Sequence, residues 1–234
     1  REAVLCTPRG LRYLMIVAKH VDSSVKVTKP ALSVRRFQYE SRGRFESADK
    51  TLNMIWELGR RTLAGTVQET FLDSPCHEQA QYIADAMIQS WAGYHLFGSF
   101  EQAAMSLEEF AAAQFETGEL PAACPSDIYI NIPDYALLWP VWLQRHYQYT
   151  GDRQLLDRLL PNLQKLFAYY EHLAAPESPA LANLGERFGA FSFLDHGDID
   201  RGGVGTGLNA MYCRALLSGA GLFTAVGNTD QAHT

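Results

Sequence analysis

Apolar residues recur at helical spacing along most of the chain after about residue 48. Their period predicts six helices, which loops containing Gly, Pro and Ser separate. The expected helices span about 49–66, 75–97, 101–116, 133–150, 152–174 and 206–226. Pro140 falls inside the fourth helix, where a proline is expected to cause a kink. No short fixed-period repeat is present, so the pattern favours packed helical hairpins over a solenoid.

The first part of the chain has a different pattern. Residues 11–17 and 25–28 alternate in polarity or are β-branched, which predicts strands. The charge changes at the same place. Up to Ser47 the chain has ten Lys and Arg against four Asp and Glu, and from Ala48 onward it has ten against twenty-two. We therefore expect a domain boundary between residues 1–47 and residues 48–234.

Composition narrows the function classes. The basic residues of the first segment are spread along the expected strands rather than clustered, which disfavours nucleic acid as a partner. An acidic helical part suits neutral ligands better than polyanions. No apolar run approaches the roughly 20 residues that span a bilayer. The four cysteines, Cys6, Cys76, Cys124 and Cys213, form no C-x-x-C pair and indicate neither a zinc site nor a disulfide framework.

The most informative stretch is residues 72–85. Ser74 followed by Pro75 predicts a helix start, and helical spacing would then place Glu78, Tyr82 and Asp85 on one face. The stretch contains three carboxylates and no Lys or Arg, whereas a solvated helix face normally mixes acids with cations. Taken singly, an acid at a helix start is more often a cap or a partner of the helix dipole. Together with nearby amides and a tyrosine, these acids are typical of a site for hydroxyl-rich ligands.

The same stretch resembles the signature of the α-L-rhamnosidases of glycoside hydrolase family 78. In that family a motif of the form D-x-P-x-x-E-(x)6-D opens an inner helix of an (α/α)6 barrel. Here Asp73, Pro75, Glu78 and Asp85 occupy the motif positions. The resemblance continues in the same order over nearly the whole chain. It includes residues 45–49, 52–57, 132–139, 149–152, 193–196 and 207–212.

The resemblance implies a mainly α fold, an (α/α)6 toroid of the six-hairpin glycosidase type. Residues 48–234 would form the first half of this barrel, and residues 1–47 the last strands of a preceding β-sandwich domain and a linker. It also implies inverting hydrolysis of terminal α-L-rhamnosides, with Glu78 as general acid. The family's base is a Glu much further downstream, which by that spacing lies beyond Thr234. We therefore expect the 234-residue chain alone to be inactive.

The resemblance also implies which residues bind the sugar. Asp73 and Asp85 correspond to its sugar-binding acids, and Tyr82 and His196 occupy places where the motif has pocket aromatics. Asp195 is expected to line the pocket, and neither it nor the nearby aspartates are assigned as the base. Trp139 is a further candidate, although an aromatic residue on that helix is more often part of the core.

Three departures leave the exact sugar open. His77 stands where many members of the family carry Arg, and His196 stands where they often carry Trp. Before the last Asp of the motif, many members carry Gly-Trp, whereas this chain has Ile83-Ala84 preceded by Tyr82. An (α/α)6 enzyme for another sugar therefore remains an alternative, as does a non-catalytic carbohydrate-binding relic or helical scaffold. A lyase acting on uronic acids would need cations near the motif, and these are scarce.

The remaining expectations concern chemistry outside the motif. A thiol nucleophile at Cys76, beside His77, is a weak alternative because neighbours on a helix point in different directions. Residues 195–202 resemble a calcium loop only faintly, since the alternating ligands and the closing Glu are missing. We expect no metal and no cofactor, a carbohydrate as partner, and neither nucleic acid nor membrane. Homo-oligomer formation and the compartment stay open.

Overall fold

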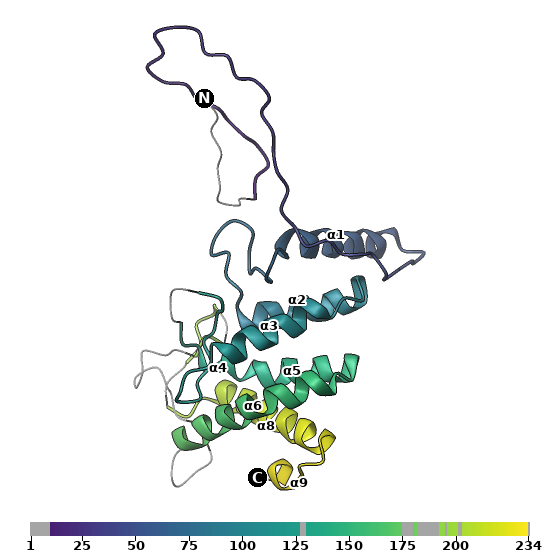
Figure 1. The fold of residues 1–234 in the computed structure, drawn as a ribbon, viewed down its shortest axis with the longest axis vertical. Coiled ribbons are helices and arrows are strands. Elements are labelled where there is room, and N and C mark those ends of the chain that lie inside the picture. The colour runs from purple at the N-terminus through teal and green to yellow at the C-terminus, as the bar shows by residue number, and fades with distance from the viewer. Residues whose placement is uncertain are drawn as a thin grey trace.

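The computed structural model describes residues 10–126, 130–174, 180–181, 192–194, 196–200 and 203–233. These residues are mainly helical (Figure 1). The helices are α1 (Lys50–Thr66), α2 (Ile83–Leu96), α3 (Glu101–Ala112), α4 (Pro133–Ala136), α5 (Leu138–Thr150), α6 (Arg153–Leu173), α8 (Thr206–Ala225) and α9 (Thr229–His233). Five of the six predicted helices are therefore found close to their expected bounds.

Local signals in the sequence explain several helix ends. Asp49 precedes α1, and its carboxylate accepts a hydrogen bond from the backbone N–H of Thr51 at 2.7 Å. Asp152 caps α6 in the same way through the N–H of Leu155 at 2.9 Å. Such caps satisfy N–H groups that have no partner inside the helix. Between α5 and α6, Gly151 takes the left-handed conformation, with φ of 64°, that commonly ends a helix.

At the predicted kink near Pro140 the helix is interrupted at one residue, Leu137, whose dihedrals stay in the right-handed helical region (φ −69°, ψ −15°). Proline has no N–H to donate to the carbonyl four residues earlier, which here belongs to Ala136. Helix α4 ends at that residue, and α5 begins two residues later at Leu138. The break leaves α4 as a single short turn that starts at Pro133.

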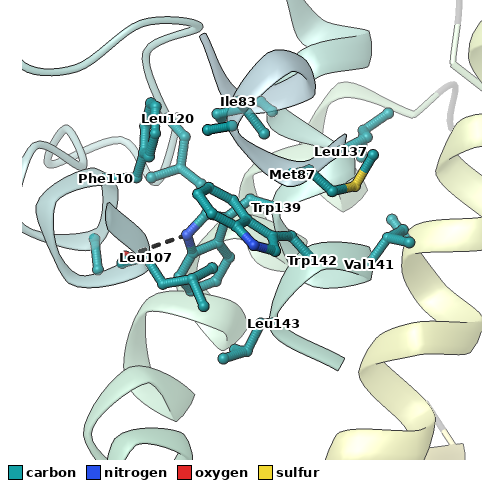
Figure 2. Packing of buried hydrophobic residues seen from close by; sticks show 14 of the residues in the cluster. Ile83, Met87, Leu107, Phe110, Leu120, Leu137, Trp139, Val141, Trp142 and Leu143 are labelled. Atoms are coloured by element: carbon teal, nitrogen blue, oxygen red, sulfur yellow. Dashed lines mark hydrogen bonds between the residues drawn. The ribbon is translucent and has the colours of Figure 1, made fainter. Parts of the chain in front are cut away.

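The helices pack in two layers around one core. Helix α5 lies between α2 and α8 and contacts both, while α1, α3 and α6 pack against this row. The core between the layers is centred on Trp139 and Trp142, neither of which has any exposed surface (Figure 2). The indole N–H of Trp139 donates to the backbone carbonyl of Leu107 at 3.3 Å, which joins α5 to α3.

Successive long helices run in opposite directions, so alternate connections meet at the same end of the stack. The described residues of the connections from α1 to α2, from α3 to α4 and from α6 to α8 lie together, on the left of Figure 1. Helices α2, α5 and α8 all begin near this end, which we call the loop end. The motif stretch 72–85 lies here. No helix among the described residues is long and apolar enough to cross a membrane.

The predicted strands at 11–17 and 25–28 are not formed. Residues 10–48 contain no strand, and the bridges found elsewhere in the described chain are isolated pairs. A strand needs a paired neighbour to be stable, and these residues pair with none. The assignment of residues 1–47 to a β-sandwich domain stays a prediction.

The end of this segment packs on the helical part. The ring of Tyr39 stacks on that of Phe97 with centroids 4.2 Å apart, and its hydroxyl donates to Gln102 at 2.6 Å. The N–H groups of Phe37 and Gly43 donate to the carbonyls of Val67 and Leu96. An earlier contact is made by Gly10, whose N–H donates to the carbonyl of Pro75 at 3.2 Å, so contacts with the helical part are not confined to residues after the expected boundary at residue 47.

A buried histidine makes the stability of the chain depend on pH. His146 on α5 is 2% exposed, and its Nδ1 lies 2.8 Å from the Tyr94 hydroxyl on α2. Burial lowers the pKa of His146 from 6.5 to about 4, although the charge of Asp152 opposes this shift. The unfolded chain therefore binds this proton at a higher pH than the folded chain does.

We expect the free energy of unfolding to fall by about 3 kcal/mol as the pH decreases from about 6.5 to about 4 through this group. His146→Gln, which does not titrate and can still accept from Tyr94, should remove that part of the pH dependence. Denaturant unfolding at several pH values measures it. His172→Gln, at an exposed position on α6, is the control and should keep the wild-type dependence. Equal pH dependence in all three proteins would contradict the assignment.

Candidate functional site

The motif stretch is a structured loop and not the first turns of a helix. Helix α2 begins at Ile83, so the predicted start at Ser74-Pro75 is wrong, as is the helical face shared by Glu78 and Asp85. Gln79 has a left-handed φ of 55°, which interrupts any helix. The chain then pairs with residues 122–124, because the N–H of Ile83 donates to Ala122 and the carbonyl of Gln81 accepts from Cys124.

Asp73 closes the loop on itself. Its backbone N–H donates to the carbonyl of Ala80 at 2.9 Å, and its carboxylate accepts from the N–H of Ala80 at 2.8 Å. Within the loop, the hydroxyl of Ser74 accepts from the N–H of His77 at 3.3 Å. Ser74 therefore caps a turn of the loop, and residues 74–79 project as a closed unit that carries Glu78.

The side-chain amide of Gln81 fixes the base of this loop in the core. Gln81 is 1% exposed, and its oxygen accepts from the N–H of Phe71 and from the hydroxyl of Ser106. Its nitrogen donates to the carboxylate of Glu109 and to the carbonyl of Cys124. All four hydrogen bonds that the amide can make are therefore formed. Sequence analysis missed this residue, because a glutamine between two loop residues carries no signal of burial.

Four of the predicted site residues come together at the loop end. Burial raises the pKa of Tyr82, and the neighbouring carboxylates of Glu78, Asp73 and Asp85 raise it further. Glu78 is exposed, while the other three are half-buried. We call Asp73, Glu78, Tyr82 and Asp85 the acid cluster.

The acid cluster has no compensating cation among the described residues that act on it. Burial raises the pKa of Asp85, and the negative charges of Asp73 and Glu78 raise it further. Backbone hydrogen bonding at the first turn of α2 opposes this rise, as expected for an acid near the positive end of a helix dipole. The cluster is therefore an electronegative surface to which a neutral, hydrogen-bond-donating ligand could bind.

A row of aromatic rings joins the acid cluster to the other predicted pocket residue. Tyr82 contacts Tyr135 edge to face at 6.1 Å between centroids, and Tyr135 contacts Phe193 at 5.7 Å. Phe193 in turn contacts His196 at 4.7 Å. The three interplanar angles lie between 87° and 89°, the edge-to-face arrangement that aromatic pairs favour. The structure thus connects Tyr82 with His196 through two rings that sequence analysis did not select.

The remaining predicted residues have different outcomes. Trp139 lies in the core with no exposed surface and donates to Leu107, so it cannot contact a ligand here (Figure 2). This position is a correction, because Trp139, the second residue of α5, points its indole toward α3 and not toward the loop end. Asp195 lies outside the described residues. Asp198 and Asp200 are exposed on the loop that follows His196.

A cavity of about 540 Å³ lies beside the loop of His196. The start of α8 and the segment 203–205 line it together with Ser192, Leu194, Ile199 and Asp200, and its polar side chains are those of Ser192, Asp200 and Thr206. Gly207 borders it, and a Cβ there would lie 2.9 Å from the side chain of Leu194. Within the part of the chain that the structure describes, no three His, Cys, Asp or Glu side chains are arranged to hold a metal ion.

Fold and site together define a mainly helical domain whose loop end carries a carboxylate cluster, and no cation among the described residues contributes to the pKa shifts of that cluster. Residues 40–219 match the family model of the bacterial alpha-L-rhamnosidase six-hairpin glycosidase domain. This match covers most of the chain, and the chain therefore belongs to that family. The predicted family and the mainly α, six-hairpin fold class are thereby confirmed. No curated protein sequence gives a significant match.

Solved structures agree with this assignment. The GH78 family rhamnosidase of Bacillus sp. GL1 has 25% sequence identity to the chain and a TM-score of 0.76. The rhamnosidase from Klebsiella oxytoca with rhamnose bound has 18% identity and a TM-score of 0.67. The alpha-L-rhamnosidase from Dictyoglumus thermophilum has 16% identity and a TM-score of 0.70. These alignments cover 85%, 80% and 85% of this chain but 20%, 37% and 22% of the others.

The chain thus spans between a fifth and two fifths of the length of these rhamnosidases. The comparisons place it in a glycoside hydrolase family and make it rhamnosidase-like.

Replacing the buried amide tests how the loop is held. Gln81→Leu has a similar size but leaves the N–H of Phe71, the hydroxyl of Ser106 and the carbonyl of Cys124 without this partner. Because an unpaired buried polar group costs about 1–3 kcal/mol, we expect the free energy of unfolding to fall by about 3 kcal/mol or more. Denaturant unfolding measures the change. Gln148→Leu, exposed on α5, should change it by less than about 0.5 kcal/mol, and a similarly small effect at Gln81 would contradict the prediction.

Proposed function

We propose that the chain provides the general-acid side of an inverting α-L-rhamnosidase site, with the acid cluster as its centre. One observation carries the proposal. Glu78 is exposed at the loop end beside Tyr82, the charges of Asp73 and Asp85 lie close by, and no cation contributes to the pKa shifts of Tyr82 and Asp85. Membership of the rhamnosidase family supports it. The alternatives are an (α/α)6 enzyme for another sugar and a non-catalytic carbohydrate-binding module.

In this proposal Glu78 gives a proton to the glycosidic oxygen as the bond to the sugar breaks. Its exposure lets the leaving group reach it, and the Tyr82 hydroxyl orients the carboxyl group. A bound sugar would exclude water from the acid cluster, and exclusion of water favours the protonated form of a carboxyl group. Asp73 and Asp85 would accept hydrogen bonds from the sugar hydroxyls, since a carboxylate is purely an acceptor.

The aromatic row supplies the other half of the proposed recognition. Rings offer an apolar surface to the carbon face of a sugar and, in rhamnose, to its methyl group. Tyr82 and His196 lie at the two ends of this row. We assign them as sugar-contacting residues, and we keep Asp195 as a proposed pocket residue on the strength of the sequence motif.

Inversion requires a second carboxylate that activates a water on the opposite face of the sugar, roughly 6.5–9.5 Å from the acid. We propose that this base lies beyond Thr234, as the motif spacing implies. The chain alone should then bind the sugar without hydrolysing it. Turnover of an unactivated rhamnoside by the purified 234-residue chain would overturn this part of the proposal.

Glu78→Gln tests the acid. In a rhamnosidase that contains this chain together with the base, we expect kcat on a rhamnoside with a poor leaving group to fall at least about 100-fold, because general acid catalysis contributes that much. The affinity for L-rhamnose should persist. Steady-state kinetics and a binding titration measure the two quantities. His77→Gln, its exposed neighbour, is the matched control. Wild-type turnover by Glu78→Gln would remove Glu78 from this role.

Asp85→Asn tests a conflict between stability and binding. The raised pKa of Asp85 means that its charge destabilises the folded chain at any pH above its ordinary value of 3.8. Asp85→Asn should therefore raise the free energy of unfolding at pH 7, and this gain should vanish once the pH falls below about 3.8. The same variant should weaken L-rhamnose binding about tenfold or more, through loss of a charged acceptor.

Unfolding and binding titrations on the same samples measure both effects of Asp85→Asn. Asp157→Asn is the control, because Asp157 is half-exposed and paired with Arg153 on α6. It should leave binding unchanged and give no gain in stability. A loss of stability at pH 7 in Asp85→Asn would contradict the electrostatic account, and unchanged affinity would remove Asp85 from the sugar site.

A further inference from the structure

We propose that Asp134 is a positioning residue, whose buried carboxylate holds the His196-bearing loop against the acid cluster. This inference rests on the proposed function, because it concerns how the acid cluster and His196 are held at a fixed separation in the same proposed sugar site. Asp134 lies in the single turn of α4, directly before Tyr135. It is 1% exposed, so its negative charge is almost wholly removed from water.

The contacts of this carboxylate are made to the backbone of the distant loop. One oxygen accepts from the N–H of Phe193 and the other from the N–H of Leu194, both at 2.9 Å. The two donors lie 59 and 60 residues further along the chain. Hydrogen bonds to an ionised acceptor are about twice as strong as neutral ones, and burial strengthens them further. The carboxylate thus fixes two successive peptide groups of the loop.

The conformation of the loop indicates why such an anchor is needed. Leu194 has a left-handed φ of 52°, which is rare for a residue with a side chain and costs of order 1 kcal/mol or more. Such a conformation persists only where its surroundings fix it. Here the N–H of Leu194 is held by Asp134, and its side chain packs against Gly207, where a Cβ would come within 2.9 Å of it and force it to shift.

The same turn of α4 also reaches the acid cluster. Tyr135 lies between Tyr82 and Phe193 and contacts both rings edge to face. Asp134 therefore holds the backbone of the loop at Phe193 and Leu194. Tyr135 separates the ring of Phe193 from the ring of Tyr82. Two adjacent residues of one helical turn set the separation between the proposed acid and His196.

Asp134→Asn is the direct test. An amide keeps one accepting oxygen but turns a donor toward the second N–H, so one hydrogen bond is lost and replaced by a repulsive contact. We expect the loop to move and the L-rhamnose dissociation constant to rise at least about tenfold. The NMR signals of the His196 ring, which lies in the ring-current field of Phe193, should shift toward those of an unstructured histidine.

Asp152→Asn is the matched control, because it removes another structural carboxylate that accepts from a backbone N–H. It should lower the free energy of unfolding while the His196 signals and the L-rhamnose affinity stay at their wild-type values. If Asp134→Asn behaves like this control, Asp134 has a merely structural role and the proposal is wrong.

A second variant keeps the proposal testable if Asp134→Asn does not fold. Phe193→Leu leaves the carboxylate and both N–H donors in place but removes the ring between Tyr135 and His196. It should displace the His196 signals and weaken L-rhamnose binding, and unchanged values would contradict the positioning role. If the wild-type chain does not bind L-rhamnose, the proposed function fails separately, and the His196 signals still decide whether Asp134 holds the loop.

Discussion

The fully satisfied amide of Gln81 is the interaction on which the loop end depends. Three carboxylates lie close together there without a cation among the described groups that act on them, so their mutual repulsion favours an open loop. The amide opposes this through four hydrogen bonds: two join the base of the loop to α3, one joins it to Cys124 before α4, and one joins it to the N–H of Phe71. Asp73 then closes the projecting part onto Ala80. The buried hydrogen bonds of Gln81 thus offset the repulsion between the carboxylates of the acid cluster.

The separation of the loop end from the hydrophobic core follows from the two-layer fold. The tryptophan core between α3 and α5 carries no site residue, and the alternating direction of the helices brings three connections to one end. Function can therefore be concentrated in loops while stability resides in the helices. Helix α4 is the exception, because it is a single turn whose two central residues contact both sides of the proposed site. Because Pro140 has no N–H to donate to the carbonyl of Ala136, the helix is interrupted between this turn and α5. The residues of the turn contact the loops on both sides of the proposed site.

Periodicity was sufficient to predict most helices. Apolar spacing predicts α1 and α6 within one residue at each end, and the end of α5 at Thr150, because the period is a local signal. The start of α2 could not be predicted, because pairing of residues 81–83 with residues 122–124 outweighs the local helix signals at Ser74 and Pro75. The strands expected in residues 11–28 fail for a related reason, since a strand depends on neighbours that the pattern does not supply.

The site residues differ in the same way: those within one local motif could be predicted, and those that act through distant partners could not. Asp73, Glu78, Tyr82 and Asp85 could be selected because they fall within one short motif, and the structure brings them together although the helical geometry assumed for them was wrong. Gln81 and Asp134 could not be selected, because each acts through partners between 10 and 60 residues away. Trp139 was selected on residue type alone, and its indole lies in the core.

The most direct measurement of the central claim is a calorimetric titration of the chain with L-rhamnose and, separately, with D-galacturonate. A cluster made only of carboxylates should bind the neutral sugar and reject the anionic one. An Asp73→Asn/Asp85→Asn double variant should lose the affinity for L-rhamnose. This result would establish the acid cluster as the sugar site. Binding of D-galacturonate as tight as that of L-rhamnose, or L-rhamnose binding that the double substitution leaves unchanged, would contradict it.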